Sequence, residues 1–182
     1  MEREKTVSSL SADLDIPLER DIFLRTLVRE LSGNLQEIIG IDEASGFVSL
    51  VGQNMGMAID QDYKKALGVS QLTREQVADV LVDLKRRIKG DFYIIEQDEE
   101  KIVLGNRACP FGDKVIDRPA MCMMTSNVFG SIAAENLGYA KVELQKMIAL
   151  GDPGCLVVVH LKQTPASDAC RGREYFKGDR SE

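Results

Sequence analysis

Residues 107–122 read RACPFGDKVIDRPAMC, and residues 151–161 read GDPGCLVVVHL. These two stretches hold three of the four cysteines: Cys109 in a Cys-Pro-Phe-Gly turn, Cys122 twelve residues further on, and Cys155 after an Asp-Pro-Gly turn. Each thiol therefore lies where regular secondary structure begins or ends. Backbone amides near such turns are free to point at an anionic group. We expect the three thiols to converge on one metal centre, iron–sulfur rather than zinc.

The composition restricts the class of protein. A chain of 182 residues predicts one sizeable domain. The net charge of −6, from 23 basic and 29 acidic residues, argues against a nucleic-acid partner. The absence of an apolar run of about 18 residues or more argues against a membrane partner, and the charged N-terminus resembles no secretion signal. Four cysteines without a secretion signal favour a cytoplasmic protein whose thiols serve as ligands, redox groups or buried side chains.

The first half of the chain has helical periodicity. Residues 1–13 are polar and predict a flexible leader, which is followed by a helix that begins near Pro17 and ends at Gly40. Asp42 suits the N-cap of a second helix. Its expected apolar stripe comprises Phe47, Val48, Val51, Met55, Ala58 and Ile59. Gly46, Gly52 and Gly56 each cost about 1 kcal/mol in helix propensity, which leaves two explanations: close helix packing within the chain, or a dimer interface.

A third helix begins at Thr73, because Gln76 completes a capping-box pattern, and it ends at Gly90. Its last turn carries Lys85, Arg86, Arg87 and Lys89, which we interpret as a solvated turn that suits the helix dipole.

Strand patterns follow this helix. Residues 92–95 and 102–104 predict a hairpin. Pro119 opens a fourth helix, apolar on most faces, that ends at Gly138, and residues 140–148 and 155–161 predict two more strands. The sequence thus predicts an α+β domain at 14–162, with N-terminal helices packed on an antiparallel sheet of about four strands and a cysteine-bearing helix between two hairpins. Residues 163–182 predict a polar tail.

The cysteines admit more than one interpretation. A single thiol is as often a small buried apolar group as a ligand. The spacing matches neither a zinc-finger pattern nor a ferredoxin run. Cys122 in the first turn of a helix is expected to have a lowered thiol pKa. With His160 as the single histidine, and no clear base beside a cysteine, we expect no enzymatic activity.

The motifs resemble known sensory domains. The CPFG turn, the twelve-residue interval and the GDPGC turn are similar to the C-terminal iron–sulfur domain of SufR-type repressors. Residues 18–162 resemble methanogen output domain 1 still more closely, through DFYIIE, NRACPFGD, CMMTSNVFG and GYAKVEL. Both families are similar in plan to the vinyl-reductase-type domain of phenol-responsive activators.

The resemblance implies a sensory function. It implies an iron–sulfur cluster, such as 4Fe-4S, bound by Cys109, Cys122 and Cys155, with redox state, oxygen or nitric oxide as the signal. The repressors carry a further cysteine upstream, where this chain has Gly105, Asn106 and Arg107. The open candidates for a fourth ligand are Asp152, ranked first, then Asp113, His160 and Cys170, or an exogenous molecule. We expect a homodimer that signals to a partner protein.

The alternative is a zinc-stabilised sensor of small molecules. Its pocket would be lined by the Met and Phe side chains of the fourth helix together with Met55 and Met57, and it would bind an aromatic or tetrapyrrole-like molecule.

Overall fold

The computed structural model describes residues 19–178, so the expected leader at 1–13 lies outside the described residues. The elements in chain order are α2 (Arg20–Ile39), α3 (Ile41–Leu67), α4 (Arg74–Arg87), β1 (Phe92–Gln97), β2 (Lys101–Asn106), η1 (Gly112–Val115), η2 (Pro119–Met121), α5 (Cys122–Leu137), β3 (Tyr139–Lys146), η3 (Ile148–Leu150), β4 (Cys155–His160), α6 (Pro165–Ala169) and β5 (Arg173–Phe176). Within residues 19–178, no helix combines the length and apolar character needed to cross a bilayer.

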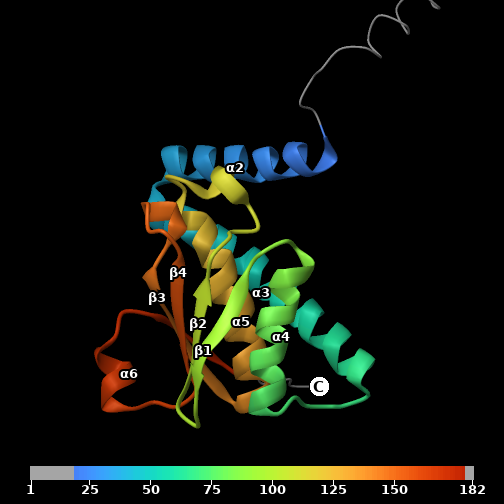
Figure 1. Cartoon of the computed structure of the whole chain (residues 1–182). Coiled ribbons are helices and arrows are strands. Elements are labelled where there is room, and N and C mark those ends of the chain that lie inside the picture. Colours follow the sequence, from blue (N-terminus) through green and yellow to red (C-terminus); the bar gives the residue numbers. More distant parts are fainter. Residues whose placement is uncertain (1–18, 179–182) are drawn as a thin grey trace, which may run out of the picture.

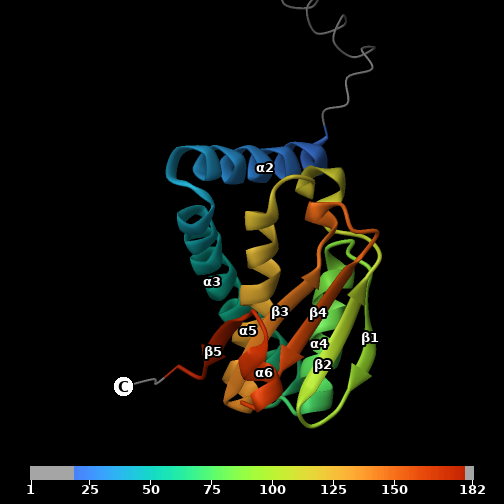
Figure 2. The same ribbon diagram turned by 90° about the vertical axis from the view of Figure 1, so that its left-hand side faces the viewer.

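The strands form one antiparallel sheet in the order β1-β2-β4-β3-β5. Helices α4 and α5 cover one face of it, and α3 packs on the outside of α5 (Figures 1 and 2). The main core lies between the sheet and these helices, and Phe129 and Ile132 of α5 are fully buried in it. The α+β prediction is therefore confirmed, with five strands in place of about four.

Local signals placed several boundaries correctly. Thr73 forms the expected capping box with Gln76 at the start of α4. Pro119 begins a 3₁₀ turn that leads into α5, and Gly138 ends that helix with a φ of 92°. A φ in this range is accessible to glycine at no steric cost, which explains the stop.

The glycines of α3 allow close packing within the chain. A Cβ atom at Gly52 would lie 2.9 Å from Asn127 Cβ, and one at Gly56 would lie 3.0 Å from Ser131 Cβ, both on α5. Gly46 has nothing within 4 Å. Two of the three glycines therefore serve the contact between α3 and α5 rather than a dimer interface.

A buried polar network joins the same two helices. Asp60 of α3 accepts a hydrogen bond of 2.6 Å from Asn136 Nδ2 of α5, and Asp60 also pairs with Lys64 at 2.6 Å. Asn136 Oδ1 accepts from the backbone N–H of Leu72, just before α4. Because Asp60 and Asn136 are both almost fully buried, these bonds hold α3, α5 and the start of α4 in one arrangement.

The apolar stripe expected on α3 is divided: Val48 is buried and Ile59 packs against the main core, whereas Phe47, Val51 and Met55 are 57, 50 and 44 % exposed. Apart from Val48, the buried residues of α3 are small or polar. The apolar residues of α3 do recur with helical periodicity, but Gly52 and Gly56 lie on the side of the helix that contacts α5. The larger side chains are left on the outside of the domain.

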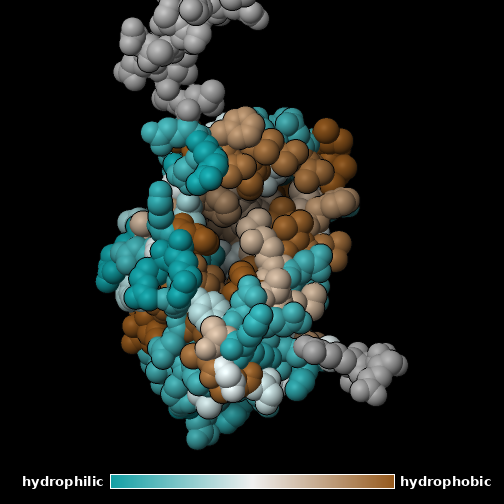
Figure 3. Space-filling model, turned by 90° about the vertical axis from the view of Figure 1, so that its right-hand side faces the viewer, coloured by the Kyte–Doolittle hydropathy of each residue, from teal (hydrophilic) through white to brown (hydrophobic). Residues whose placement is uncertain are grey.

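Helix α2 lies across one end of the domain and adds to this surface (Figures 1 and 2). Twelve of the seventeen exposed large apolar side chains belong to α2 and α3. They are Phe23, Leu24, Leu27, Leu31, Ile38, Ile41, Phe47, Leu50, Val51, Met55, Met57 and Leu67. We call this set the α2–α3 apolar surface, and Figure 3 shows it as brown area in the upper right of the molecule.

The segment expected as a polar tail contributes to the fold. Residues 165–169 form α6, and β5 pairs with the edge of β3, where Tyr175 packs into the main core. The Tyr175 hydroxyl lies 2.9 Å from Ser126 Oγ of α5. The four-residue strand has too few apolar residues to be recognised by alternation alone, and its pairing partner is more than 30 positions away.

The contact between α3 and α5 generates the first prediction. Gly52→Val is expected to lower the free energy of unfolding by about 1–3 kcal/mol, because the added atoms meet Asn127 and the backbone of Met124. Gly46→Ala is the control, expected to be neutral or stabilising by up to about 1 kcal/mol, since alanine favours a helix and nothing opposes its Cβ. Urea unfolding of both variants measures the difference, and an equal effect of the two changes would contradict the packing argument.

Candidate metal centre

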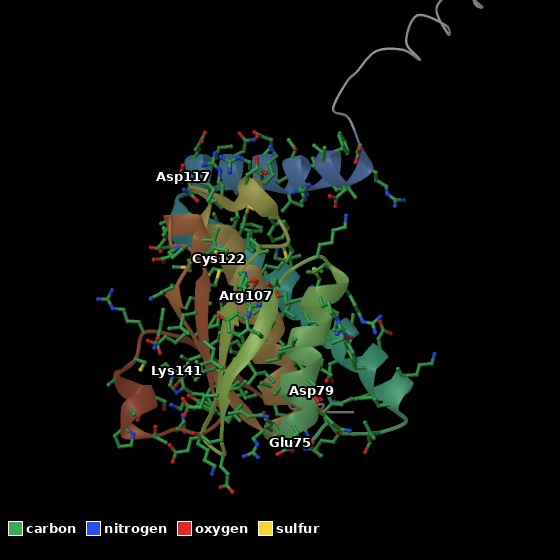
Figure 4. All side chains as sticks on the ribbon, viewed as in Figure 1. Glu75, Asp79, Arg107, Asp117, Cys122 and Lys141 are labelled. Atoms are coloured by element: carbon green, nitrogen blue, oxygen red, sulfur yellow. The ribbon has the colours of Figure 1, made fainter. Side chains whose placement is uncertain are left out.

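Three thiols from distant parts of the chain line one small pocket. Cys109 lies in the loop after β2, Cys122 is the first residue of α5, and Cys155 is the first residue of β4. The pocket lies at the end of the domain that α2 covers, where Figure 4 labels Cys122. Its other walls are mostly apolar and include Phe111, Met121, Leu144 and Met147.

Turn chemistry positions two of these thiols. The loop turns back directly after Cys109, whose carbonyl accepts a hydrogen bond of 2.9 Å from Gly112, a glycine with a φ of 58°. The N–H groups of Phe111 and Gly112 also lie within hydrogen-bonding reach of the Cys109 sulfur. Gly154 passes so close to β2 that a Cβ atom there would lie 2.7 Å from the Asn106 carbonyl oxygen. The Pro-Gly and Pro-Phe-Gly sequences thus bring Cys155 and Cys109 to the same pocket.

The separation of the sulfur atoms bears on what they can hold. Cys109, Cys122 and Cys155 do not form a group whose sulfur atoms all lie within 4.8 Å of one another. At least one pair of these sulfurs is therefore farther apart than the roughly 3.8 Å expected between thiolates on a single tetrahedral zinc ion with bonds of about 2.3 Å. In a polynuclear cluster, different metal atoms bind different thiolates, so a wider spacing fits such a guest.

A buried lysine lies among the thiols. Lys85 of α4 is 5 % exposed, and its Nζ donates a hydrogen bond of 2.7 Å to Thr125 Oγ1. The same nitrogen lies 5.4 Å from the centroid of the Phe92 ring and 5.3 Å from that of the Phe129 ring. Burial lowers the pKa of Lys85 to about 8, and thiolate charge at Cys109, Cys122 and Cys155 acts in the opposite direction. The pocket therefore has a cation placed to stabilise negative charge on its sulfurs.

Sequence reasoning missed Lys85, which we expected in a solvated turn. A signal was present, because residues 78, 81 and 85 follow the helical spacing of the buried side of α4. The basic neighbours Arg86 and Arg87 concealed it, since their side chains are exposed and pair with Asp83.

Burial, rather than the helix dipole, has the larger effect on the pKa of the Cys109 and Cys122 thiols. It raises the pKa of Cys122 to about 12, with further contributions from the charges of Cys155 and Cys109. Burial likewise raises the pKa of Cys109. The prediction that the pKa of the Cys122 thiol is lowered is wrong, because the first turn of α5 is covered by apolar side chains. In the metal-free protein these two thiols hold their protons at neutral pH, so binding of a metal releases them.

The fourth-ligand candidates lie elsewhere. Asp152 does not line the pocket, because its Oδ2 accepts a hydrogen bond of 2.8 Å from the Met147 N–H and closes the turn around η3. Asp113 is exposed at 78 % on η1. His160 and Cys170 lie together at the far end of β4. A polar side chain that does contact a pocket thiol is Asn106, whose Nδ2 is 3.5 Å from Cys155 Sγ.

The loop that carries Cys109 is attached to α2. Arg29 donates to the carbonyl oxygens of Lys114 and Ile116 at 2.8 and 2.7 Å, and Arg25 donates to Phe111 at 3.4 Å. A small second core continues this contact, because Val28 of α2 packs against the same buried cluster as Cys109, Phe111 and Cys122. The Cys109 loop is therefore fastened to α2 by both hydrogen bonds and apolar packing.

Comparisons with known proteins agree with this architecture. The sequence model described as methanogen output domain 1 matches residues 27–160, and no curated protein matches the chain. The phenol-responsive sensory domain of the transcription activator PoxR, solved with phenol, is similar with a TM-score of 0.64 and 13 % identity over 85 % of this chain and 80 % of that one. Trafficking protein particle complex subunit 3 from Naegleria fowleri, covalently bound to palmitic acid, is similar with a TM-score of 0.55 and 15 % identity over 78 % of this chain and 96 % of that one.

The buried cation generates a second prediction. At pH 7, metal-free Lys85→Met protein is expected to be at least as stable as the wild type. Its free energy of unfolding should be higher by up to about 2 kcal/mol, because methionine fills the same space without a buried charge. A lowered lysine pKa favours the neutral group in the folded state, so wild-type stability rises as the pH increases from about 8 to 10.5. The advantage of the variant should therefore shrink over that range.

Urea unfolding of chelator-treated, reduced protein at pH 7 and pH 10 provides the measurement. The exposed Lys65 offers the matched change Lys65→Met, which is expected to show neither effect. A loss of several kcal/mol in Lys85→Met would mean that the ammonium group stabilises the metal-free fold, contrary to the argument from burial.

Proposed function

Because the chain belongs to the methanogen output domain 1 family, we propose that it is a cytoplasmic sensory domain whose three cysteines hold an iron–sulfur cluster. The state of that site, altered by redox change, oxygen or nitric oxide, would be reported to a partner protein. The observation that carries the proposal is the convergence of Cys109, Cys122 and Cys155 on one apolar pocket next to a buried lysine.

The donor set supports a cluster over a single ion. Three thiols lie too far apart for one tetrahedral zinc without rearrangement, and the backbone N–H groups of Phe111 and Gly112 lie beside the Cys109 sulfur. Lys85 offsets part of the negative charge that thiolates and inorganic sulfide bring together. Hydrogen bonds and nearby charge of this kind tune the reduction potential of iron–sulfur centres.

The cluster and the residues around it have different roles in the proposed site. When bound, the cluster would supply one-electron chemistry and reactivity toward small oxidants. Apolar side chains such as Phe111 and Met121 exclude water from the sulfurs. The repressors' additional cysteine corresponds to the region of buried Asn106, whose amide reaches Cys155, and we propose that an exogenous ligand completes the site there.

The Cys109 loop provides the route to the rest of the domain. The pocket is small, about 30 Å³, and Cys109, Phe111 and Val115 of the loop at residues 107–118 form part of its wall. A guest larger than this space would displace the loop. Arg25 and Arg29 hold this loop on α2, so occupancy of the site changes the position of α2.

The α2–α3 apolar surface is the proposed output surface, and we assign it to a second copy of this chain. Monomeric proteins rarely expose so many adjacent large apolar side chains, and α2 contributes both to this surface and to the loop contact. A change at the thiols would thereby alter the dimer, and through it the contact with a signalling partner.

One observation favours a second candidate function, a zinc-stabilised sensor of small molecules. A groove of about 600 Å³ adjoins the thiol pocket, and it is lined by Ile41, Ser45, Pro119, Met123, Ser126, Val142, Leu144, Met147, Arg171, Gly172 and Arg173. Its size and mostly apolar lining suit a small aromatic molecule with an acidic group. Met55 and Met57, expected in such a pocket, lie instead on the exposed side of α3.

Anaerobic reconstitution tests the proposed function. Protein supplied with ferrous iron and sulfide should take up both and acquire visible absorption, and each of Cys109→Ser, Cys122→Ser and Cys155→Ser should lose most of the iron. Cys170→Ser is the matched control, because Cys170 lies outside the pocket, and it should retain the cluster. Colourless protein without iron would overturn the proposal, and one zinc per chain without sulfide would favour the second candidate.

Lys85→Met provides an additional readout in the same experiment. Removal of the cation should lower the reduction potential of the cluster and speed its loss in air, because the negative charge of the site is no longer offset. Unchanged potential and lifetime would mean that Lys85 has a structural role alone.

The dimer generates a separate prediction. Phe47→Glu, in the middle of the α2–α3 apolar surface, should convert the protein to a monomer in sedimentation or light-scattering measurements, because the interface would bury an unpaired carboxylate. Ile95→Glu is the control, since Ile95 is 53 % exposed on β1, which lies at the edge of the sheet far from α3 (Figure 2). A wild-type protein that remains monomeric at high concentration would contradict the assignment.

A further inference from the structure

A second group of metal-ligating side chains lies at the other end of β4. The carboxylate of Glu143, the imidazole of His160 and the thiol of Cys170 have one ligand atom each within 4.8 Å of the other two. They come from three elements: β3, the last position of β4, and the residue that ends α6. We propose that these three residues bind one transition-metal ion, with zinc as the occupant their chemistry favours.

This group is independent of the three-cysteine pocket. Successive side chains of a strand point to opposite faces, so His160 and Cys155, five positions apart on β4, face opposite sides of the sheet and lie about 16 Å apart along it. Cys155 packs against the main core, whereas His160 faces the side occupied by α6. Lys141, whose Nζ donates to the Ser167 carbonyl of α6, is labelled on this side in Figure 4, away from Cys122.

The distances suit a shared cation. His160 Nε2 and Glu143 Oε2 lie 3.4 Å apart, which is longer than a typical N–H···O hydrogen bond. Two ligands on a tetrahedral zinc ion, with bonds of about 2.0–2.1 Å, lie about 3.4 Å apart. A thiolate, an imidazole and a carboxylate form a ligand set that zinc accepts, and three protein ligands leave a fourth position for water.

The surroundings hold the ligands in place before any metal binds. Gln145 donates to Glu143 Oε2 at 3.1 Å. Helix α6 begins with a capping box between Thr164 and Ser167, and buried Lys141 attaches it to β3 through the Ser167 carbonyl at 2.7 Å. Cys170 follows directly, and its thiol donates to the Ala166 carbonyl oxygen at 3.1 Å. The side chains of His160 and Glu143 are only 13 and 16 % exposed, so the site is sheltered but open to an ion.

The ion would fasten the C-terminal segment to the sheet. Residues 161–178 are joined to the rest of the domain through α6, the short strand β5 and few buried side chains, among them Ser167 and Tyr175. A metal bridge between Cys170 and the two strand ligands closes the loop that follows β4. Binding therefore stabilises the edge of the sheet at β3 and β5.

The single histidine makes the test specific. The ring resonances of His160 in the full chain, prepared metal-free and reduced, are followed by NMR as zinc chloride is added. We expect His160 signals to shift in a saturable manner, with one equivalent of zinc assigned to this site, and Cys170→Ser to weaken that binding by tenfold or more. Cys109→Ser is the matched control, since it alters the other thiol site and should leave the His160 response intact.

Cobalt provides a second readout that does not depend on NMR. Cobalt(II) bound at this site should give thiolate-to-metal charge-transfer absorption that persists in Cys109→Ser and is lost in Cys170→Ser, and His160→Gln should weaken it. Unchanged His160 signals at excess zinc, or an equal response in Cys170→Ser, would overturn the proposal. Neither result depends on whether the three-cysteine pocket holds a cluster.

Discussion

The close approach of α3 to α5 is the constraint on which the rest of the structure depends. Gly52 and Gly56 present no side chain of their own to α5, and the buried pair Asp60 and Asn136 fixes the register of the two helices. Helix α5 is thereby enclosed between the sheet and α3, so that Phe129 and Ile132 fill the core while Cys122 is carried to one end of it. A buried polar pair at this position specifies one arrangement, because any slip would leave a desolvated carboxylate without its partner.

The same contact determines the character of the outer surface. Since the small side of α3 is used internally, its larger apolar side chains face outward and join those of α2. This surface and the thiol pocket share α2, which contacts the Cys109 loop through Arg25 and Arg29. Helix α2 therefore contacts both the loop of the proposed cluster site and the proposed dimer surface.

Strand β4 separates the two proposed metal sites. Its first residue, Cys155, faces the helices and the buried Lys85, whereas its last residue, His160, faces α6. The first site is apolar, enclosed and supplied with a cation, which suits a guest with net negative charge. The second has mixed ligands whose atoms all lie within 4.8 Å of one another, next to a short helix, which suits a single divalent ion. The alternation of a strand thus keeps the two proposed sites on opposite faces of the sheet, although Cys155 and His160 lie within six residues.

The sequence by itself determined the principal elements from α2 to β4 and singled out the three pocket thiols, because the signals for these are local, whereas α6 and β5 escaped it. The capping box at Thr73, the stop at Gly138 and the Pro-Gly turns beside Cys109 and Cys155 each act within a few residues. The tertiary structure alone decided which side of α3 is buried, that Lys85 lies among the thiols, and that His160 and Cys170 meet Glu143 rather than the pocket. These outcomes depend on contacts between residues from 10 to about 75 positions apart, and periodicity reports the faces of an element without stating which neighbour covers each face.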